Sequence, residues 1–187
     1  GPELSSSEFS IVNGTKDLGH PAVGIVHAGG LGGCTGTLFA SNKVLTAAHC
    51  VLTKTKPYKI IQPVYFYVGG FLGQKYKAIS VVPHPNYTGG NASDLAVIKL
   101  GKNVAGVAPM PLAASAPKTG EKITIVGYGL PGDNKGQFGT KRKATAEIVQ
   151  MSLSVFVFKG GTGSLGMVCN GDSGGPSLAM RSGKEAI

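Results

Sequence analysis

The chain has 187 residues, which is enough for one ordinary domain or a small two-lobed one. Glycine occurs 30 times, only 14% of the residues are charged and no run of 18 apolar residues exists, which excludes a membrane-spanning helix. The formal net charge of +9 is carried almost wholly by lysine. Scattered lysines on a soluble basic protein explain this charge better than a nucleic-acid or other anionic partner does.

Residues 1–10 are polar and rich in serine, without any hydrophobic period. We expect them to form a flexible leader, either an activation peptide or the remnant of an expression tag. They lack the basic and apolar order of a signal peptide. The remaining residues, 11–187, are expected to form the folded domain.

Short apolar segments then recur every 10 to 15 residues, separated by turns rich in Gly, Pro and Asn. After the apolar segment 11–15, we predict strands in 22–28, 35–40, 43–51, 64–70, 77–85, 94–100, 122–129 and 146–158. The runs 22–26 and 37–40 also fit buried helices, but the glycine density and missing capping signals favour strands. This pattern is typical of an all-β barrel or sandwich.

Ser173 lies in the stretch "CNGDSGGP", where glycines surround a potential nucleophile. A serine hydroxyl needs a base, a group that orients the base, and donors for the oxyanion that forms. Glycine allows backbone N–H groups to point outward. The N–H groups of Gly171 and Ser173 are therefore candidates for an oxyanion hole.

The base must be one of four histidines, and each of them taken singly is more often structural than catalytic. His49, in "VLTAAHCV", ends an apolar run, whereas His20 and His84 adjoin prolines and His27 adjoins a Gly-rich turn. Asp94 heads the apolar strand "DLAVIKL" and is the candidate for the orienting acid, although a strand-start aspartate is the ordinary interpretation.

Together, "LTAAHC", "DLAVIKL" and "CNGDSGGP" resemble the His, Asp and Ser motifs of the trypsin-like (chymotrypsin-fold) serine proteases, in that family's order. "IVNGT" is similar to the family's mature N-terminus, and "IVGYG" to its "GWG" strand with Tyr128 in place of Trp. The resemblance spans residues 11 to about 178. It implies two antiparallel six-stranded β-barrels with the active site in the cleft between them.

The resemblance also implies the role of each residue. His49 is general base and then acid, Asp94 fixes its tautomer, and Ser173 attacks the carbonyl to form an acyl-enzyme. Gly171 and Ser173 hold the oxyanion, and Cys34 and Cys50 form the family's disulfide. No metal and no cofactor are required.

Two further residues are carried over from the family's activation mechanism. Cleavage frees the amine of Ile11, which pairs with the buried carboxylate of Asp172 and shapes the oxyanion turn. Ile11 is still joined to Ser10, so the sequence reads as a precursor. A trypsin-like activator would not cut after Ser10.

The resemblance places Met167, six positions before the nucleophile, at the floor of the primary pocket. A pocket for Lys or Arg needs a carboxylate there, because a buried unpaired cation is unfavourable. Met167 is apolar, and no acid lies within 148–171. We therefore expect cleavage after apolar or small residues and not after Lys or Arg, with hydroxyl-bearing or acidic residues as the alternative.

The family continues past this serine strand, so the second barrel is expected to be incomplete, and the missing part normally supplies the partner of Cys169. A free thiol is the alternative for that cysteine. Asn13, Asn86 and Asn91 begin N-glycosylation sequons.

The sequence therefore predicts a secreted serine endopeptidase, present as a zymogen or fragment. Its expected partners are protein or peptide substrates, an activating protease and protein inhibitors, with no nucleic acid and no membrane. A protease homologue that has lost turnover and acts as a binding or regulatory protein is the alternative.

Overall fold

The structure is a computed structural model that describes residues 11, 14–30, 32–129, 139–152, 156–159 and 172–187. The regular secondary structure of the described part is made of β-strands and one turn of 3₁₀ helix, η1 (Ala48–Cys50). This arrangement confirms the all-β class. The same part of the chain contains no helix with the length and apolar character needed to cross a membrane.

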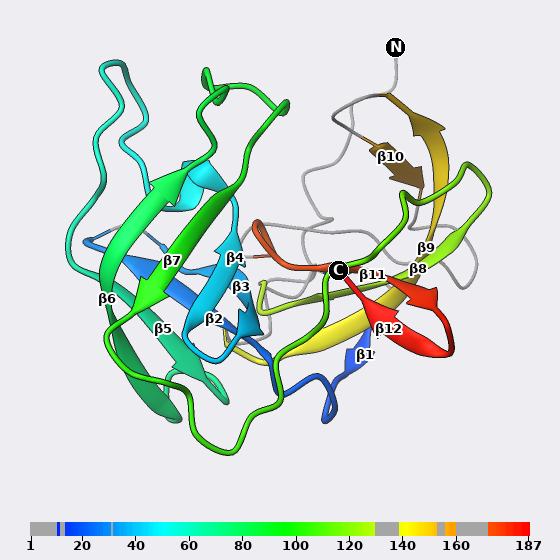
Figure 1. The fold of residues 1–187 in the computed structure, drawn as a ribbon, viewed down its shortest axis with the longest axis horizontal. Coiled ribbons are helices and arrows are strands. Elements are labelled where there is room, and N and C mark those ends of the chain that lie inside the picture. Colours follow the sequence, from blue (N-terminus) through cyan, green and yellow to red (C-terminus); the bar gives the residue numbers. More distant parts are fainter. Residues whose placement is uncertain (1–10, 12–13, 31, 130–138, 153–155, 160–171) are drawn as a thin grey trace, which may run out of the picture.

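Six antiparallel strands from the N-terminal half close into a barrel, seen on the left of Figure 1. Their order around the barrel is β2–β3–β4–β7–β6–β5, and β5 closes the ring by pairing with β2. The strands are β2 (Val23–Ala28), β3 (Cys34–Ala40), β4 (Lys43–Thr46), β5 (Val64–Val68), β6 (Gln74–Pro83) and β7 (Ala96–Leu100).

The barrel closes because its strands place an apolar side chain inward at every second residue. In β6, Tyr76, Ala78 and Val81 point into the core, and a register shift between Ala78 and Ser80 restores the inward phase after one extra residue. Phe66 from β5 and Ile98 from β7 are fully buried in the same core.

The C-terminal half forms a second, curled sheet, seen on the right of Figure 1. Its order is β1–β9–β8–β11–β12, with β10 paired to β9. The strands are β1 (Thr15–Lys16), β8 (Lys122–Gly127), β9 (Arg142–Met151), β10 (Phe156–Lys159), β11 (Ser177–Arg181) and β12 (Lys184–Ala186). Among the described residues this sheet does not close, in line with an incomplete second barrel.

Two predicted strands are each divided in the structure. The run 43–51 is strand only to Thr46, because the N–H groups of Cys50 and Val51 bond back to the carbonyls of Ala47 and Ala48 and form η1. The run 146–158 contributes to β9 and β10, which pair with each other as antiparallel neighbours. The apolar runs 22–26 and 37–40 lie in or beside strands and contain no helix.

The two sheets meet through Tyr128, which follows β8. Its hydroxyl donates a hydrogen bond to the carbonyl of Val23 (3.3 Å), and its N–H donates to the hydroxyl of Thr35 (3.0 Å). Leu178 of β11 packs into the same buried cluster. These contacts fix the serine-bearing half against the barrel.

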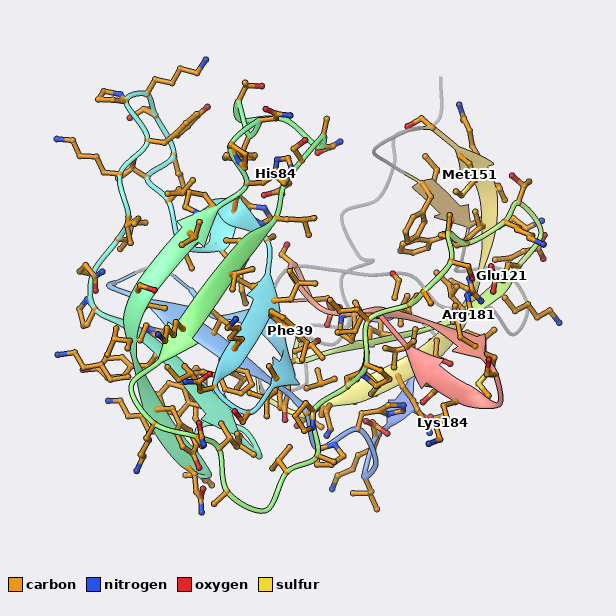
Figure 2. The ribbon with its side chains drawn as sticks, viewed as in Figure 1. Phe39, His84, Glu121, Met151, Arg181 and Lys184 are labelled. Carbon is orange, nitrogen blue, oxygen red and sulfur yellow. A yellow bond between two sulfur atoms is a disulfide. The ribbon has the colours of Figure 1, made fainter. Side chains whose placement is uncertain are left out.

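An ion pair holds the last hairpin in place. Arg181, at the end of β11, pairs with both carboxylate oxygens of Glu121, which precedes β8, and Figure 2 shows the two side chains facing each other. Bidentate contacts of this kind restrict both side chains. The β11–β12 hairpin is thereby anchored beside the start of β8.

Candidate active site

The site begins where two neighbouring barrel strands end. Thr46 of β4 is the register partner of Ala96 in β7, so the chain after β4 and the chain before β7 lie at one end of the barrel. The first of these segments carries His49 within η1, and the second carries Asp94. Two residues far apart in sequence are thus brought together by strand pairing alone.

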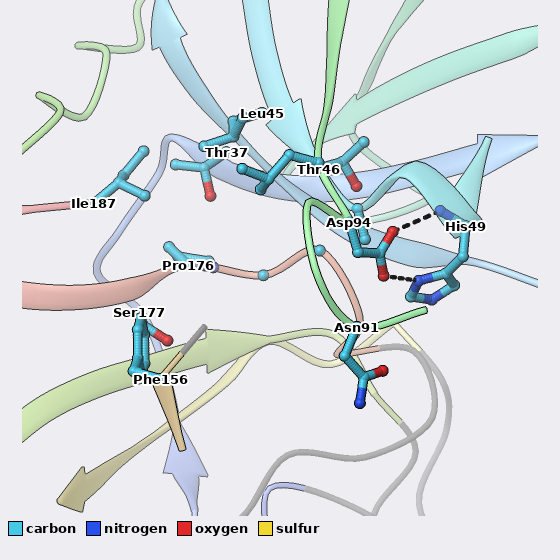
Figure 3. A pocket seen from close by; sticks show the side chains of 14 residues that line it. Thr37, Leu45, Thr46, His49, Asn91, Asp94, Phe156, Pro176, Ser177 and Ile187 are labelled. Atoms are coloured by element: carbon cyan, nitrogen blue, oxygen red, sulfur yellow. Dashed lines mark hydrogen bonds and ion pairs between the residues drawn. The ribbon is translucent and has the colours of Figure 1, made fainter. Parts of the chain in front are cut away.

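One carboxylate holds His49 at two points, as Figure 3 shows. The ring Nδ1 lies 2.6 Å from Oδ2 of Asp94, and the backbone N–H of His49 donates to Oδ1 of Asp94 at 2.9 Å. Because an ionised carboxylate only accepts hydrogen bonds, the proton of a neutral ring resides on Nδ1. Nε2 is then the basic nitrogen, and the ring is 46% exposed.

The contact between His49 and Asp94 shifts the pKa of both side chains. The hydrogen bond to Asp94 raises the pKa of His49 above its ordinary value, although burial acts in the opposite direction. Burial acts to raise the pKa of Asp94, but the hydrogen bonds from His49 and the backbone of Ala48 outweigh it and lower that pKa. The carboxylate is therefore ionised where the imidazole titrates.

Ser173 lies against the barrel beside this pair. Its carbonyl accepts a hydrogen bond from the N–H of Thr35 (2.9 Å) and lies 3.6 Å from Sγ of Cys50, the residue next to His49. Within the described part of the chain, no hydrogen bond joins the Ser173 hydroxyl to His49. Such bonds often form only when a substrate is bound.

Gly174 explains why a bare backbone follows the serine. Its φ is +80°, and a Cβ at this position would lie 2.3 Å from Oγ1 of Thr46 and 2.5 Å from the carbonyl oxygen of Thr35. Only glycine allows the turn to pack this closely against β3 and β4. The same glycine that permits the turn therefore brings the serine to the barrel.

Asp172 is almost fully buried, at 4% exposure. The N–H of Gly129 donates to its Oδ1 at 2.8 Å, and a Cβ on Gly127 would lie 2.0 Å from the same oxygen. The two glycines on either side of Tyr128 therefore make room for this carboxylate. The chain around residue 172 is packed against the end of β8.

The predicted disulfide is present between Cys34 and Cys50, with their Cα atoms 6.1 Å apart. It joins the start of β3 to η1 and so fixes the backbone on which His49 stands. Nε2 of His49 lies 3.7 Å from Sγ of Cys50. Because both sulfurs are consumed in the disulfide, these three residues do not offer a thiolate metal site.

The other histidines differ from His49 in their surroundings. Both ring nitrogens of His20 contact carboxylates, Asp17 at 2.9 Å and Glu185 at 2.7 Å, so neither is left for a substrate. His27 contacts the edge of an aromatic ring, and His84 accepts a hydrogen bond from a backbone N–H. The His49 ring combines a carboxylate at one nitrogen with exposure to a pocket.

That pocket has a volume of about 400 Å³ and is open beside the histidine–aspartate pair. Figure 3 shows that its walls come from both halves of the molecule. They include Thr46, His49, Asn91, Asp94, Phe156, Gly175 and Ile187. A site of this kind can bind a substrate segment next to a general base.

Several predicted site residues lie outside the described part of the chain. These are Gly171 of the oxyanion hole, Met167 of the primary pocket, and also Cys169 and Asn13. Conversely, sequence reasoning did not single out Thr35 and Thr46, which position the serine turn. A threonine within a strand is an ordinary β-former, so no signal in the sequence distinguishes these two.

Comparison with known proteins agrees with this geometry. The family model described as Trypsin matches residues 11–187. The chain is 28% identical over 165 residues to a beta-fibrinogenase-like protein of Daboia siamensis, covering 78% of this chain and 62% of that protein. It is also 28% identical to the serine protease SP24D of Anopheles gambiae, covering 78% of this chain and 58% of that protein.

A third relative is the chymotrypsin-like elastase family member 1 of Felis catus, 26% identical over 174 residues, which cover 82% of this chain and 65% of that protein. The chain thus spans about six tenths of the length of the curated relatives that it matches.

Proposed function

The chain belongs to the trypsin family of serine proteases, and from this premise we propose that it is a secreted endopeptidase acting through an acyl-enzyme. The observation that carries the proposal is the two-point contact between His49 and Asp94 beside the backbone of Ser173. The disulfide Cys34–Cys50 supports an extracellular location, because disulfides persist in oxidising compartments.

The proposed reaction has two halves. His49 takes the proton of the Ser173 hydroxyl as the serine oxygen attacks the scissile carbonyl, and then gives that proton to the leaving amine. Water, activated by His49, hydrolyses the resulting ester. Asp94 holds the ring in the required tautomer and stabilises the imidazolium.

The oxyanion of each tetrahedral intermediate would be bound by the N–H groups of Gly171 and Ser173. A single donor of this kind contributes about 2.7–4 kcal/mol to lowering the barrier. This chemistry uses side chains and backbone groups of the protein itself.

Activation is proposed to require cleavage between Ser10 and Ile11, which separates the leader 1–10 from the protease domain 11–187. Two observations support this step. Ile11 is only 2% exposed and packs into the apolar core of the second sheet, and the carboxylate of Asp172 is also buried. A new amine paired with that carboxylate would hold the serine turn in its active geometry. The activating protease would be one that cleaves after Ser.

Specificity is proposed to exclude Lys and Arg before the scissile bond, because Met167 offers a basic side chain only a weak acceptor. Protein or peptide substrates are the proposed partners, together with protein inhibitors of the active form.

A peptide panel tests this function. Peptides that differ only in the residue before the scissile bond are assayed before and after defined cleavage at Ser10–Ile11. We expect hydrolysis after cleavage alone, with the highest kcat/KM for apolar or small residues. Best cleavage of the Lys or Arg peptides would refute the Met167 argument, and equal activity of the uncut chain would refute the activation step.

A further inference from the structure

The acidic and basic residues are distributed unequally between the two halves of the molecule. Residues 18–104, which contain the whole closed barrel, include eight lysines and one acid, Asp94, whose carboxylate is bound to His49. The other acids of the described part lie in or beside the second sheet: Asp17, Glu121, Glu147, Asp172 and Glu185. Among the described residues, the outside of the barrel therefore carries positive charge without a compensating acid.

Three of these lysines form a row across neighbouring strands. Lys43 of β4 lies directly opposite Lys99 of β7. Lys77 of β6 lies diagonally from Lys99, because its carbonyl accepts a hydrogen bond (3.0 Å) from the N–H of Gly101, two residues after Lys99. All three side chains are exposed and point to the outer face, since their strand neighbours point into the core. Adjacent strands are about 4.8 Å apart, so the row extends roughly 10 Å.

Two cross-strand pairs, each of a lysine and a tyrosine, connect the row to β5. Tyr65 lies opposite Lys77, and Tyr67 lies opposite Lys75. The ammonium of Lys75 stands 3.8 Å from the centre of the Tyr65 ring and 5.7 Å from that of Tyr67. In Figure 2, nitrogen-tipped side chains project from this outer side of the barrel.

In the part of the chain that the structure describes, no acid compensates the charge of these lysines. Like charges directly opposite each other in a sheet are destabilising, and Lys43 faces Lys99. The ion pairs among the described residues include none of Lys43, Lys75, Lys77 and Lys99. An external anion bound along the row would relieve the repulsion.

We propose that this face, the row of Lys43, Lys77 and Lys99 with Lys75 beside it, binds a linear acidic polysaccharide. Lysine is a compact point charge without the planar fork of arginine, so it suits sulfate or carboxylate groups repeated along a flexible chain. No arginine lies in residues 18–104. This site lies beyond the proposed proteolytic function and does not depend on it.

The surroundings of the row favour a polysaccharide over other polyanions. Proteins that bind single-stranded nucleic acids without sequence preference stack bases on open aromatic faces, whereas Lys75 already covers Tyr65. A protein partner would need an apolar interface centre, but here the exposed Ile79 and Val82 alternate with polar and charged side chains.

The location of the row suits a tether for the enzyme. Lys43 belongs to β4, which precedes His49, and Lys99 belongs to β7, which follows Asp94, yet none of these lysines lines the pocket. A polysaccharide on this face would therefore hold the protein while leaving the pocket open to substrate.

The site is tested by measuring the affinity for heparin and for polygalacturonate at 50, 100 and 200 mM NaCl. Titration calorimetry or fluorescence anisotropy gives this affinity. The variant Lys43→Gln/Lys77→Gln/Lys99→Gln is compared with the control Lys118→Gln/Lys122→Gln/Lys184→Gln. The control removes the same charge from exposed lysines of the other half. Urea unfolding checks that both variants remain folded.

We expect the row variant to bind at least tenfold more weakly than the native chain at 100 mM NaCl and to show a smaller salt dependence, because fewer counterions are released. The control should change affinity by less than threefold. Equal losses in both variants would show that net charge alone acts and would overturn the site. Tighter binding of oligo(dT) or of anionic vesicles, lost in the row variant, would overturn the polysaccharide assignment.

Discussion

His49 owes its orientation to Asp94, which binds both its ring and its backbone N–H. The first contact sets the tautomer, and the second fixes the position of the main chain from which the ring extends. Removing the carboxylate would therefore disturb protonation as well as placement. At the residue scale, this pair is the part of the site most directly open to test.

Substitution of Asp94 by Asn should abolish most activity of the cleaved protein, with kcat lowered by about 10⁴-fold. The pH profile of the native protein follows from the raised pKa of His49. Because the ring must be neutral to act as a base, kcat/KM should increase with pH and level off, with its half-maximal value at a pH above about 6.5. In Asp94→Asn the hydrogen bond and negative charge that raise the pKa are lost, and the midpoint should move down.

The control for this experiment is His84→Gln, which alters a histidine whose Nδ1 accepts a hydrogen bond from the backbone N–H of Asn86. It should leave the midpoint unchanged. An Asp94→Asn profile that coincides with the native profile would show that His49 is not the titrating base.

Gly129 provides a second test at this scale. A Cβ at this position would lie within 2.6–2.8 Å of the Asp172 carboxyl atoms, so Gly129→Ala should displace the carboxylate and the serine turn. We expect a loss of about 1–3 kcal/mol in the free energy of unfolding. Gly90→Ala is the matched control, because nothing lies within 4 Å of a Cβ there. Equal stability of the two variants would contradict this packing argument.

The sequence predicted candidates for the site, but not how the chain holds them. The order of the His, Asp and Ser motifs pointed to His49, Asp94 and Ser173, and the cysteine pair was predicted by resemblance and is confirmed. The contact of Gly174 with Thr35 and Thr46 was not predictable, because it depends on a close approach of segments more than 100 residues apart.

At the scale of elements, the disulfide links the start of β3 to η1. Replacement of both Cys34 and Cys50 by Ser should lower the free energy of unfolding by about 3 kcal/mol, the value expected for a loop of this length. Denaturant unfolding followed by fluorescence measures it. A double variant as stable as the native chain would show that the barrel fixes η1 without the covalent link.

Strands with a clear alternation were predictable, and those too short to show one were not. The segment 22–28 is apolar apart from Gly24 and His27, the aromatic segment 64–70 alternates, and both contain strands. β1 and β12 are only two and three residues long, so no period can reveal them. The strand ends at Thr46 because the backbone turns into η1 there, and the apolar run in the sequence gives no sign of that turn.

At the scale of the whole molecule, a closed barrel holds the histidine and aspartate while the second sheet carries the serine. Tyr128 and the hydrogen bond from Thr35 to the serine carbonyl join the two halves. Charge is also divided between them, since the barrel is rich in unpaired lysines. Composition gave the net charge, but only strand pairing reveals that several lysines form one row.

The central claim is that Ser173 is the nucleophile activated by His49, and labelling with a fluorophosphonate followed by peptide mapping tests it most directly. After cleavage at Ser10–Ile11, one label should appear on Ser173. It should be absent from Ser173→Ala and strongly reduced in His49→Ala, while His84→Ala should label like the native protein. A label on another residue, or undiminished labelling of Ser173→Ala or His49→Ala, would contradict the account.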